Sequence, residues 1–561
     1  MKTFFTLLLL LCFTQMQSQT SFDPYNYKSV KTITVSKAAV VSAHPLASEA
    51  GLWIMRNGGN AIDAAIATQL ALAVVYPGAG NLGGGGFLVA RLQDGRNIAI
   101  DYREKAPSAG SRDMYLDKDG NAITALSLQG HLAAGVPGTV AGLVTSHKYG
   151  KLPFATLVEP AIQLAKGHVI TTSEANSLNA MHKNFIMNST VVPVFVRKEM
   201  WKTGDTLIQP DLVKTLERIR DQGWKGFYEG ETARLIVEEI KRGKGLISLE
   251  DLKNYQAAER KAVVFPYKDY EIVTMPLPAS GGVLLPQMMG MIKNRDLGKK
   301  GFQTPEAVQL MIEVERRAYA DRAEFLGDPD FVKIPVKQLT SQAYLDKRMK
   351  DYQPSQAGKS SEIKHGQVAE HEETTHLSVV DQWGNAVAVT TTLNGGYGSY
   401  TVVGGAGFLL NNEMDDFSVK PGVPNMYGAL GTEANAIAPN KRMLSSMTPT
   451  IVLKNKKPYI VVGTPGGTTI TTSVFQSIVN ILEFNLSASD AVNKPKFHHQ
   501  WQPDEVMIER DFPQSTADSL QKMGYKLRKI GGIGRTELIL IKGKTIEAVA
   551  DKRGNDSAAG Y

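Results

Sequence analysis

Two threonines, Thr374 and Thr392, are the residues whose types and spacing most clearly permit chemistry. A β pattern over 375–380 and a second over 386–393 are joined by residues 381–385, whose Asp, Gly and Asn are typical of a turn. If the hairpin is symmetric about this turn, Thr374 faces Thr392, and directly opposed side chains lie about 4.5–5.5 Å apart, close enough for two hydroxyls to hydrogen-bond. A threonine hydroxyl attacks only when a base takes its proton, and the sequence offers no clear histidine for this step. Because threonine favours strands, an ordinary Thr-rich hairpin has the same pattern.

Four polar segments downstream add groups that could bind a charged substrate. Residues 411–417 carry amides and carboxylates, 420–433 form a Pro/Gly loop, and 442–449 include adjacent serines. Residues 463–469 place paired glycines before a Thr-rich, helix-like segment, an arrangement that can present backbone N–H groups to an oxyanion. Each segment by itself is also typical of a loop.

Several familiar motifs fail on spacing. The run 83–86 lacks the third glycine of a dinucleotide-binding loop and precedes a strand. Residues 117–121 begin like a calcium loop but lack its closing Glu, so a surface turn is expected. His371 and His376 are five apart and do not share a helix face, and the adjacent pair His498-His499 suits packing better than metal binding. We expect no metal site and no cofactor.

Periodic segments predict the elements that position these groups. We expect strands and helices in both halves of the chain, which favours a layered α/β or α+β architecture. The first half is expected to hold a strand at 38–41, helices at 47–55 and 61–75 (with Asn60 as N-cap), strands at 87–92 and 97–102, and a mostly helical region over 152–324 with amphipathic stretches at 210–222 and 232–241. The second half is expected to hold a polar loop at 353–373 and strands at 375–380, 386–393, 450–453 and 459–462.

Length, charge and the N-terminus bound the possible functions. The 561 residues carry a net charge of +7 without a block of like charge, which argues against nucleic-acid binding. Lys2, an apolar run to Phe13 and a polar end predict a signal peptide over 1–20. Cys12, the only cysteine, lies within it, so the mature chain would hold no disulfide and no thiol nucleophile. We therefore expect a periplasmic or secreted protein without a stable membrane anchor.

Taken together, these segments resemble one enzyme family. Thr374-Thr375-His376, the run 421–425 (Pro-Gly-Val-Pro-Asn) and the run 444–447 (Leu-Ser-Ser-Met) are similar to motifs of γ-glutamyltransferase, also called γ-glutamyl transpeptidase, an N-terminal-nucleophile hydrolase. The resemblance covers nearly all of the chain after the signal peptide. It implies a four-layer αββα sandwich and a precursor that cuts itself before Thr374. A large subunit of residues 21–373 and a small, catalytic subunit of residues 374–561 would then form one intertwined domain.

The implied cleavage suits the chemistry of threonine. Before cleavage, the Thr374 hydroxyl can attack the carbonyl of Glu373 to give an ester that water opens. After cleavage, the new α-amino group of Thr374 has a pKa of roughly 7.7–8.0, so a useful fraction is neutral and can act as the base. Thr392 would position the hydroxyl.

The resemblance also implies how a γ-glutamyl group is held. Arg103 would bind the α-carboxylate through its planar guanidinium, with Ser445 and Ser446 as further donors. Without the resemblance, a surface ion pair of Arg103 with Asp101 or Glu104 is the alternative. The remaining implied roles are the α-ammonium ligands Asn394, Glu413 and Asp416, the oxyanion-hole residues Gly466 and Gly467, and a lid that carries Tyr427.

The implied reaction is a two-step acyl transfer. Thr374 would attack the γ-amide of glutathione or a related compound, and water, an amino acid or a peptide would resolve the ester. The alternatives are a glutaryl or cephalosporin acylase of the same fold, which needs α-ammonium ligands less, and a non-catalytic periplasmic binder of γ-glutamyl compounds, which needs no free threonine.

Overall fold

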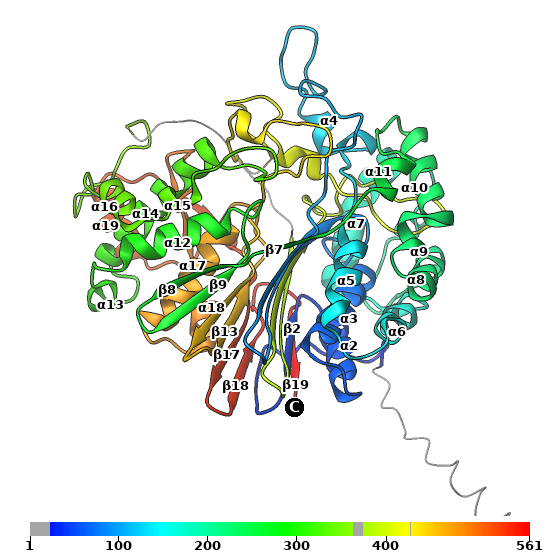
Figure 1. Ribbon diagram of the computed structural model, residues 1–561, viewed down its shortest axis with the longest axis horizontal. Helices are drawn as coiled ribbons and strands as arrows, with labels where there is room; N and C mark the ends of the chain where they lie inside the picture. Colours follow the sequence, from blue (N-terminus) through cyan, green and yellow to red (C-terminus); the bar gives the residue numbers. More distant parts are fainter. Residues whose placement is uncertain (1–22, 363–373, 427) are drawn as a thin grey trace, which may run out of the picture.

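Two seven-stranded antiparallel sheets lie face to face at the centre of the computed structural model, which describes residues 23–362, 374–426 and 428–561 (Figure 1). The first sheet has the spatial order β1 (Thr32–Val35), β18 (Thr545–Val549), β17 (Glu537–Lys542), β13 (Lys457–Gly463), β12 (Thr450–Lys454), β9 (Tyr270–Thr274) and β8 (Val263–Tyr267). The second has the order β19 (Ser557–Gly560), β2 (Ala39–Ser42), β10 (Thr375–Val380), β11 (Ala386–Thr392), β3 (Gly85–Arg91), β4 (Asn97–Asp101) and β7 (Ala258–Arg260).

Helices cover the outer face of each sheet and complete four layers (Figure 1). The second sheet is covered by helices that include α2 (Pro45–Arg56), α3 (Ala61–Val75), α5 (Thr139–Ser146), α6 (Phe154–Ala165), α8 (Pro210–Gln222) and α10 (Gly230–Arg242). The first is covered by helices that include α12 (Gly281–Ile292), α14 (Pro305–Phe325), α17 (Thr469–Leu482) and α18 (Ala488–Asn493). This is the mixed, four-layer arrangement that the family resemblance implied.

Shorter elements decorate the four layers. The remaining helices of the described residues are α4 (Ala125–Leu128), α7 (Thr172–Asn188), α9 (Lys225–Tyr228), α11 (Leu249–Lys253), α13 (Leu297–Lys300), α15 (Val336–Leu339), α16 (Gln342–Arg348) and α19 (Gln514–Lys522). The 3-10 turns are η1 (His131–Ala133), η2 (His147–Tyr149), η3 (Glu413–Asp416) and η4 (Glu433–Asn435). Two small sheets hold β5 (His168–Val169) with β6 (Thr206–Leu207), and β14 (Phe497–His498) with β15 (Val506–Glu509) and β16 (Leu527–Ile530).

Alternation along the central strands divides the core into three apolar layers. Val40 packs in the cluster between the second sheet and its helices, whereas Val41 packs in the cluster between the two sheets. Val387 and Ala388 divide in the same way on β11. Because successive side chains of a strand point to opposite faces, a strand buried on both sides is apolar at every position.

Most elements expected from periodicity are present. Helix α3 has the expected bounds, and Asn60 caps it in a reciprocal capping box with Asp63. The region 152–324, expected to be mostly helical, also holds the five strands β5 to β9, which the prediction missed. Strand β8 lies at a sheet edge, includes Pro266 and alternates between exposed and partly buried residues, so its pattern is weak.

Each sheet combines strands from before and after the 373–374 junction. In the second sheet, β10 and β11 lie between β2 and β3, and in the first sheet, β12 pairs with β9. Within the described ranges, no helix is both long and apolar enough to cross a membrane. The expected signal peptide, with Cys12, lies outside the described residues.

Candidate active site

The β10–β11 hairpin has the register expected from its turn. Thr375 pairs with Thr391 and Val380 pairs with Ala386, so Thr374 lies opposite Thr392 at the open end of the hairpin. Their Oγ1 atoms are 3.4 Å apart, and both residues are buried. The predicted hydroxyl pair is therefore formed.

The segment that follows β11 fixes the second hydroxyl. The Asn394 N–H donates to Thr392 Oγ1 at 2.8 Å, and the Asn394 side chain donates to the Asn412 carbonyl at 3.0 Å. Asn394 has φ +74°, a left-handed conformation that asparagine tolerates better than most residues. Since Thr392 Oγ1 accepts from this backbone N–H, its own O–H can donate to Thr374 Oγ1.

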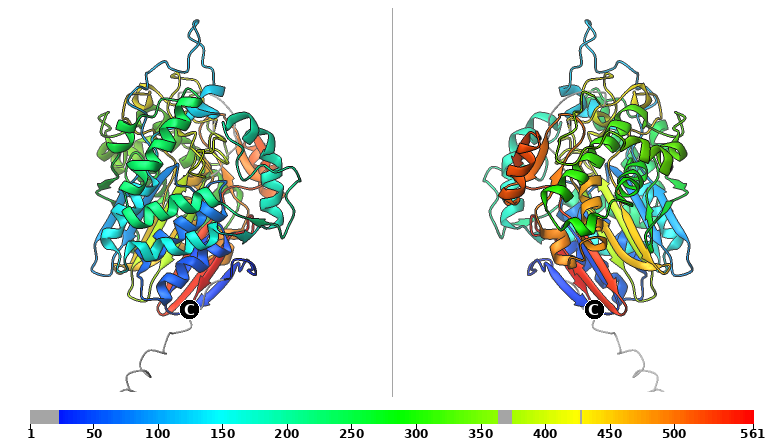
Figure 2. Two further views of the ribbon diagram at one scale, coloured as in Figure 1. Left: turned by 90° about the vertical axis from the view of Figure 1, so that its right-hand side faces the viewer. Right: turned by 90° about the vertical axis from the view of Figure 1, so that its left-hand side faces the viewer.

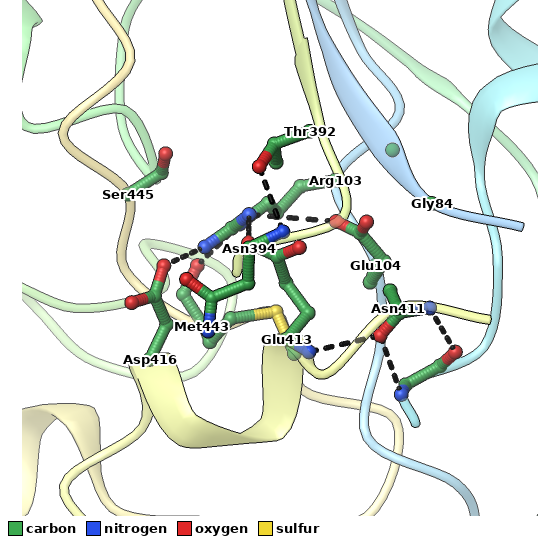
Figure 3. Close-up of polar contacts among 12 residues, drawn as sticks. Gly84, Arg103, Glu104, Thr392, Asn394, Asn411, Glu413, Asp416, Met443 and Ser445 are labelled. Carbon is green, nitrogen blue, oxygen red and sulfur yellow. Dashed lines mark hydrogen bonds and ion pairs between the residues drawn. The ribbon is translucent and has the colours of Figure 1, made fainter. Parts of the chain in front are cut away.

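Arg103 is a fully buried residue at the end of β4, not a surface one. Its guanidinium forms ion pairs with Glu413 and Asp416 and lies 3.5 Å from Glu104 (Figure 3). We call these four residues the charge cluster. Nε also donates to the Met443 carbonyl at 3.3 Å, so the guanidinium plane is held from several sides.

Burial dominates the electrostatics of the charge cluster. It raises the pKa of Glu413 well above its ordinary value and the pKa of Glu104 to about 7, although the Arg103 charge opposes both shifts. The pKa of Asp416 is raised for the same reason. Glu413 Oε2 is buried and has no hydrogen-bond partner among the described residues. A cationic donor at this position would relieve the desolvation of an ionised carboxylate.

Two serines form the opposite wall. Ser445 and Ser446 precede β12, and Figure 3 shows the Ser445 side chain separated from Glu413 by the Arg103 guanidinium. The Ser280 N–H donates to the Ser445 carbonyl at 2.7 Å, and the Ser445 N–H donates to the Pro278 carbonyl at 2.9 Å. These backbone bonds fix the serine pair at the end of the first sheet.

The expected oxyanion glycines lie in the turn between β13 and α17. Gly466 and Gly467 have φ +134° and +43°, backbone conformations that favour glycine. Their carbonyls accept the Thr469 and Ile470 N–H groups and so begin the helix. Tyr319 of α14 donates its hydroxyl to the Thr468 carbonyl, which anchors this turn to the helical layer.

A pocket with about 310 Å³ of empty space brings most of these residues together. Of the residues expected at the site, its lining includes Thr374, Thr392, Gly467, Arg103, Asn394, Glu413, Asp416, Ser445 and Ser446. Gly466 lies beside it in the chain, and Glu373 and Tyr427 lie outside the described residues. The yellow segment that carries η3 lies at one end of the molecule and the C-terminus at the other (Figures 1 and 2).

The prediction missed three polar residues of this pocket. Thr468 lies in the predicted segment 463–469 and Asn425 in the run 421–425, but neither was assigned a role. Asn425 donates to Asp416 Oδ1 at 3.0 Å. Arg322 comes from α14 and precedes Thr374, the next pocket-lining residue along the chain, by 52 residues. Nothing in its local sequence distinguishes Arg322 from Arg316 and Arg317 of the same helix.

The histidines are held by other partners. His376 contacts Thr390 Oγ1 at 2.9 Å and Ser378 Oγ at 3.1 Å, and burial lowers its pKa to about 3. His498 contacts Thr472, whereas His499 contacts Asp504. In the described part of the chain, no group of three or more acidic, histidine or cysteine side chains is arranged to hold a metal ion.

One protein family and three known proteins are similar to this chain in sequence or in fold. The family described as Gamma-glutamyltranspeptidase matches residues 47–561. A glutathione hydrolase proenzyme of Escherichia coli is 44% identical over 537 residues, which is 94% of this chain and 93% of that protein. The crystal structure of Helicobacter pylori γ-glutamyltranspeptidase is 45% identical with a TM-score of 0.56, and the match covers 94% of that chain but 58% of this one. A Bacillus halodurans cephalosporin acylase shares the fold at 24% identity, with a TM-score of 0.83 over 96% of this chain and 99% of that one.

Proposed function

The chain belongs to the γ-glutamyltranspeptidase family, and from this premise we propose how its residues carry out the reaction. The protein is an enzyme of γ-glutamyl transfer and hydrolysis that is made as an autoprocessed precursor. Glutathione and related γ-glutamyl compounds are the donors that we propose. Water, amino acids or peptides are the proposed acceptors.

Thr374 is the proposed nucleophile in both maturation and turnover. In the precursor, its hydroxyl attacks the Glu373 carbonyl, the peptide nitrogen leaves as the Thr374 amine, and water hydrolyses the resulting ester. In the mature enzyme, this amine takes the hydroxyl proton while Oγ1 attacks the γ-carbonyl of the donor. The departing amine receives the proton, and the acceptor then releases the γ-glutamyl group from the threonine ester. Thr392 steadies Oγ1 through the hydroxyl contact.

The charge cluster is the proposed site for the two charges of the glutamyl head. Arg103 binds the α-carboxylate together with Ser445 and Ser446. Glu413 and Asp416 bind the α-ammonium. The remaining ammonium ligand is Asn394. The observation that carries this proposal is that the Thr374–Thr392 pair and the charge cluster line one pocket.

Backbone amides supply the proposed electrostatic stabilisation. Gly466 and Gly467 would donate N–H groups to the oxygen that becomes negative when Thr374 attacks. Losing one such donor commonly costs about 2.7–4 kcal/mol of activation free energy. Tyr427, on the expected lid, would close the pocket over the ester and exclude water.

Two subunits arise from the one precursor, as the proenzyme relatives indicate. We place the boundary at Glu373–Thr374, so that residues 21–373 and 374–561 form one intertwined heterodimer after removal of a signal peptide. The proposed location is the periplasm or the exterior.

The acylase alternative is weaker because of the charge cluster. A glutaryl group has no α-ammonium, so an acylase substrate would bring no cation to Glu413 and Asp416 beyond the Arg103 guanidinium with which they already pair. The solved cephalosporin acylase supports the fold alone at 24% identity. A non-catalytic binder of γ-glutamyl compounds would not require the contact between the Thr374 and Thr392 hydroxyls.

Substitution of the nucleophile tests the proposal. Purified wild-type protein should give two bands on a denaturing gel and hydrolyse a γ-glutamyl anilide. Thr374→Ala should remain a single chain and release no anilide. Cleavage at the same position in Thr374→Ala, found by mass spectrometry of the new N-terminus, would remove Thr374 from the mechanism.

A further inference from the structure

Arg322 is a buried guanidinium in the last turn of α14 that reaches the pocket of Thr374. Only 7% of the residue is exposed. It lines the pocket together with Arg103 and Ser446, although it lies far from both in the sequence. Arg322 has no role in the proposed mechanism.

Its ion pairing sets Arg322 apart from the other buried arginines of α14. Arg316 and Arg317 both pair with Glu313 on the same helix. Arg322 has no carboxylate within ion-pair distance in the described ranges, whereas the Arg103 guanidinium is occupied by Glu413 and Asp416. Because burying a charge without an opposite charge is costly, this pocket is suited to receive an anion.

The contacts of Arg322 determine the orientation of a serine hydroxyl. Nη2 donates to Ser446 Oγ at 3.2 Å, and Nε points to Ser280 Oγ at 3.4 Å. A guanidinium can only donate, so Ser446 Oγ accepts, and the Ser446 hydroxyl hydrogen must point elsewhere. An anion in the pocket would receive that hydrogen. Ser280 also holds the Ser445 carbonyl through its N–H, so Arg322 contacts both sides of the serine turn.

We propose that Arg322 is a positioning residue for the α-carboxylate of the donor. It turns the Ser446 hydroxyl towards the carboxylate and supplies a positive charge that lies within ion-pair distance of no carboxylate among the described residues. This inference rests on the proposed function. The two guanidiniums would then have different roles. Arg103 is ion-paired with Glu413 and Asp416, the proposed ammonium ligands, whereas Arg322 acts on the carboxylate side only.

Three anilide donors separate a carboxylate-specific role from a general one. The γ-glutamyl anilide has both charges, the glutaryl anilide keeps only the carboxylate, and the 4-aminobutyryl anilide keeps only the ammonium. Arg322→Met should raise KM for the γ-glutamyl anilide about 10- to 100-fold, with a change in kcat below about threefold. It should weaken use of the glutaryl anilide similarly and use of the 4-aminobutyryl anilide little. Arg322→Lys should recover part of the loss.

A double-mutant cycle tests whether Arg322 acts through Ser446. The effects of Arg322→Met and Ser446→Ala on KM should be less than additive on the γ-glutamyl anilide, because removing either residue disrupts the same contact. Arg317→Lys is the matched control on the same helix, and its donor preference should equal that of the wild type. Additive effects, or an equal loss on all donors that the wild type uses, would overturn the inference. If the wild type itself fails on γ-glutamyl anilide, the proposed function fails instead.

Discussion

The two hydroxyls of the Thr374–Thr392 pair have different surroundings, and this difference suggests their division of labour. Thr392 is fixed by the Asn394 N–H, whereas Thr374 stands at the start of β10 beside the junction that we expect to be cut. A fixed hydroxyl can orient its neighbour, and a hydroxyl at a new chain terminus has an amine within reach. These surroundings support the proposed roles, positioning for Thr392 and attack for Thr374.

Removal of the Thr392 hydroxyl should slow both reactions of Thr374. Thr392→Ala should reduce the rate of precursor cleavage and kcat/KM for a γ-glutamyl anilide by about 10- to 100-fold, the usual effect of losing a hydrogen bond to a developing charge. Thr392→Ser keeps the hydroxyl and should recover most of both rates. A time course on denaturing gels, with steady-state kinetics on the processed enzyme, measures them. Unchanged rates in Thr392→Ala would show that the 3.4 Å contact has no part in the reaction.

The rise of kcat/KM with pH should result from deprotonation of the Thr374 amine and not of Glu104. The amine must lose a proton to act as a base, so kcat/KM should rise with pH through roughly 7.7–8.0. Glu104 also titrates in this region, since burial raises its pKa to about 7. Glu104→Gln removes that titration, and its pH profile should keep the rise. A flat profile in this variant, with wild-type processing, would assign the rise to Glu104.

At the scale of elements, loops of the second half are anchored by helices of the first. Glu239 of α10 is fully buried and accepts hydrogen bonds from the Thr190 hydroxyl at 2.7 Å and the Gly404 N–H at 3.2 Å. His131 Nε2 lies 2.8 Å from the same carboxylate. One side chain therefore connects η1, the segment after α7 and the loop that follows β11.

Glu239→Gln should destabilise the protein in a pH-dependent way. Burial would raise the pKa of Glu239, but hydrogen bonds from its partners lower it to about 2. A pKa below the unfolded value of about 4.3 means that the ionised group stabilises the fold above pH 4.3, by roughly 2–3 kcal/mol, and that this contribution is lost as the pH falls towards 2.

Denaturant unfolding at several pH values measures this effect. The difference in unfolding free energy between wild type and Glu239→Gln should be largest near pH 7 and should start to shrink below about pH 4.5. Glu231→Gln is the control on the same helix. Glu231 forms an exposed pair with Arg234, so its replacement should leave the unfolding free energy nearly unchanged. A difference that does not depend on pH would mean that the Glu239 charge is not responsible.

At the scale of the whole molecule, the interleaved strands determine how the cleaved protein holds together. The hairpin β10–β11 is paired on both sides by strands from before residue 373, and β12 and β13 continue a sheet whose edge is β9 and β8. Separating the two halves would expose both the layer between the sheets and strand edges in each sheet.

The two fragments should therefore remain together after cleavage. On gel filtration in native buffer they should elute as one species, and they should separate only in denaturant. Residues 374–561 expressed alone should give no cooperative unfolding transition, since β10, β11 and β12 would each lose a neighbouring strand of the first half. Recovery of a folded, isolated small fragment would show that the interleaving is not needed for its fold.

The sequence by itself determined the local features of this protein. Helix α3 with its Asn60 cap and the Thr374–Thr392 register follow from spacing and turn chemistry, because these features depend on residues close in the chain. Edge strand β8 could not be found in this way, since its weak pattern gains meaning only beside β9. Arg322 was equally hidden. Its local sequence resembles that of Arg316, and only tertiary packing pairs Arg316 with Glu313 and brings the Arg322 guanidinium to Ser446 at the pocket.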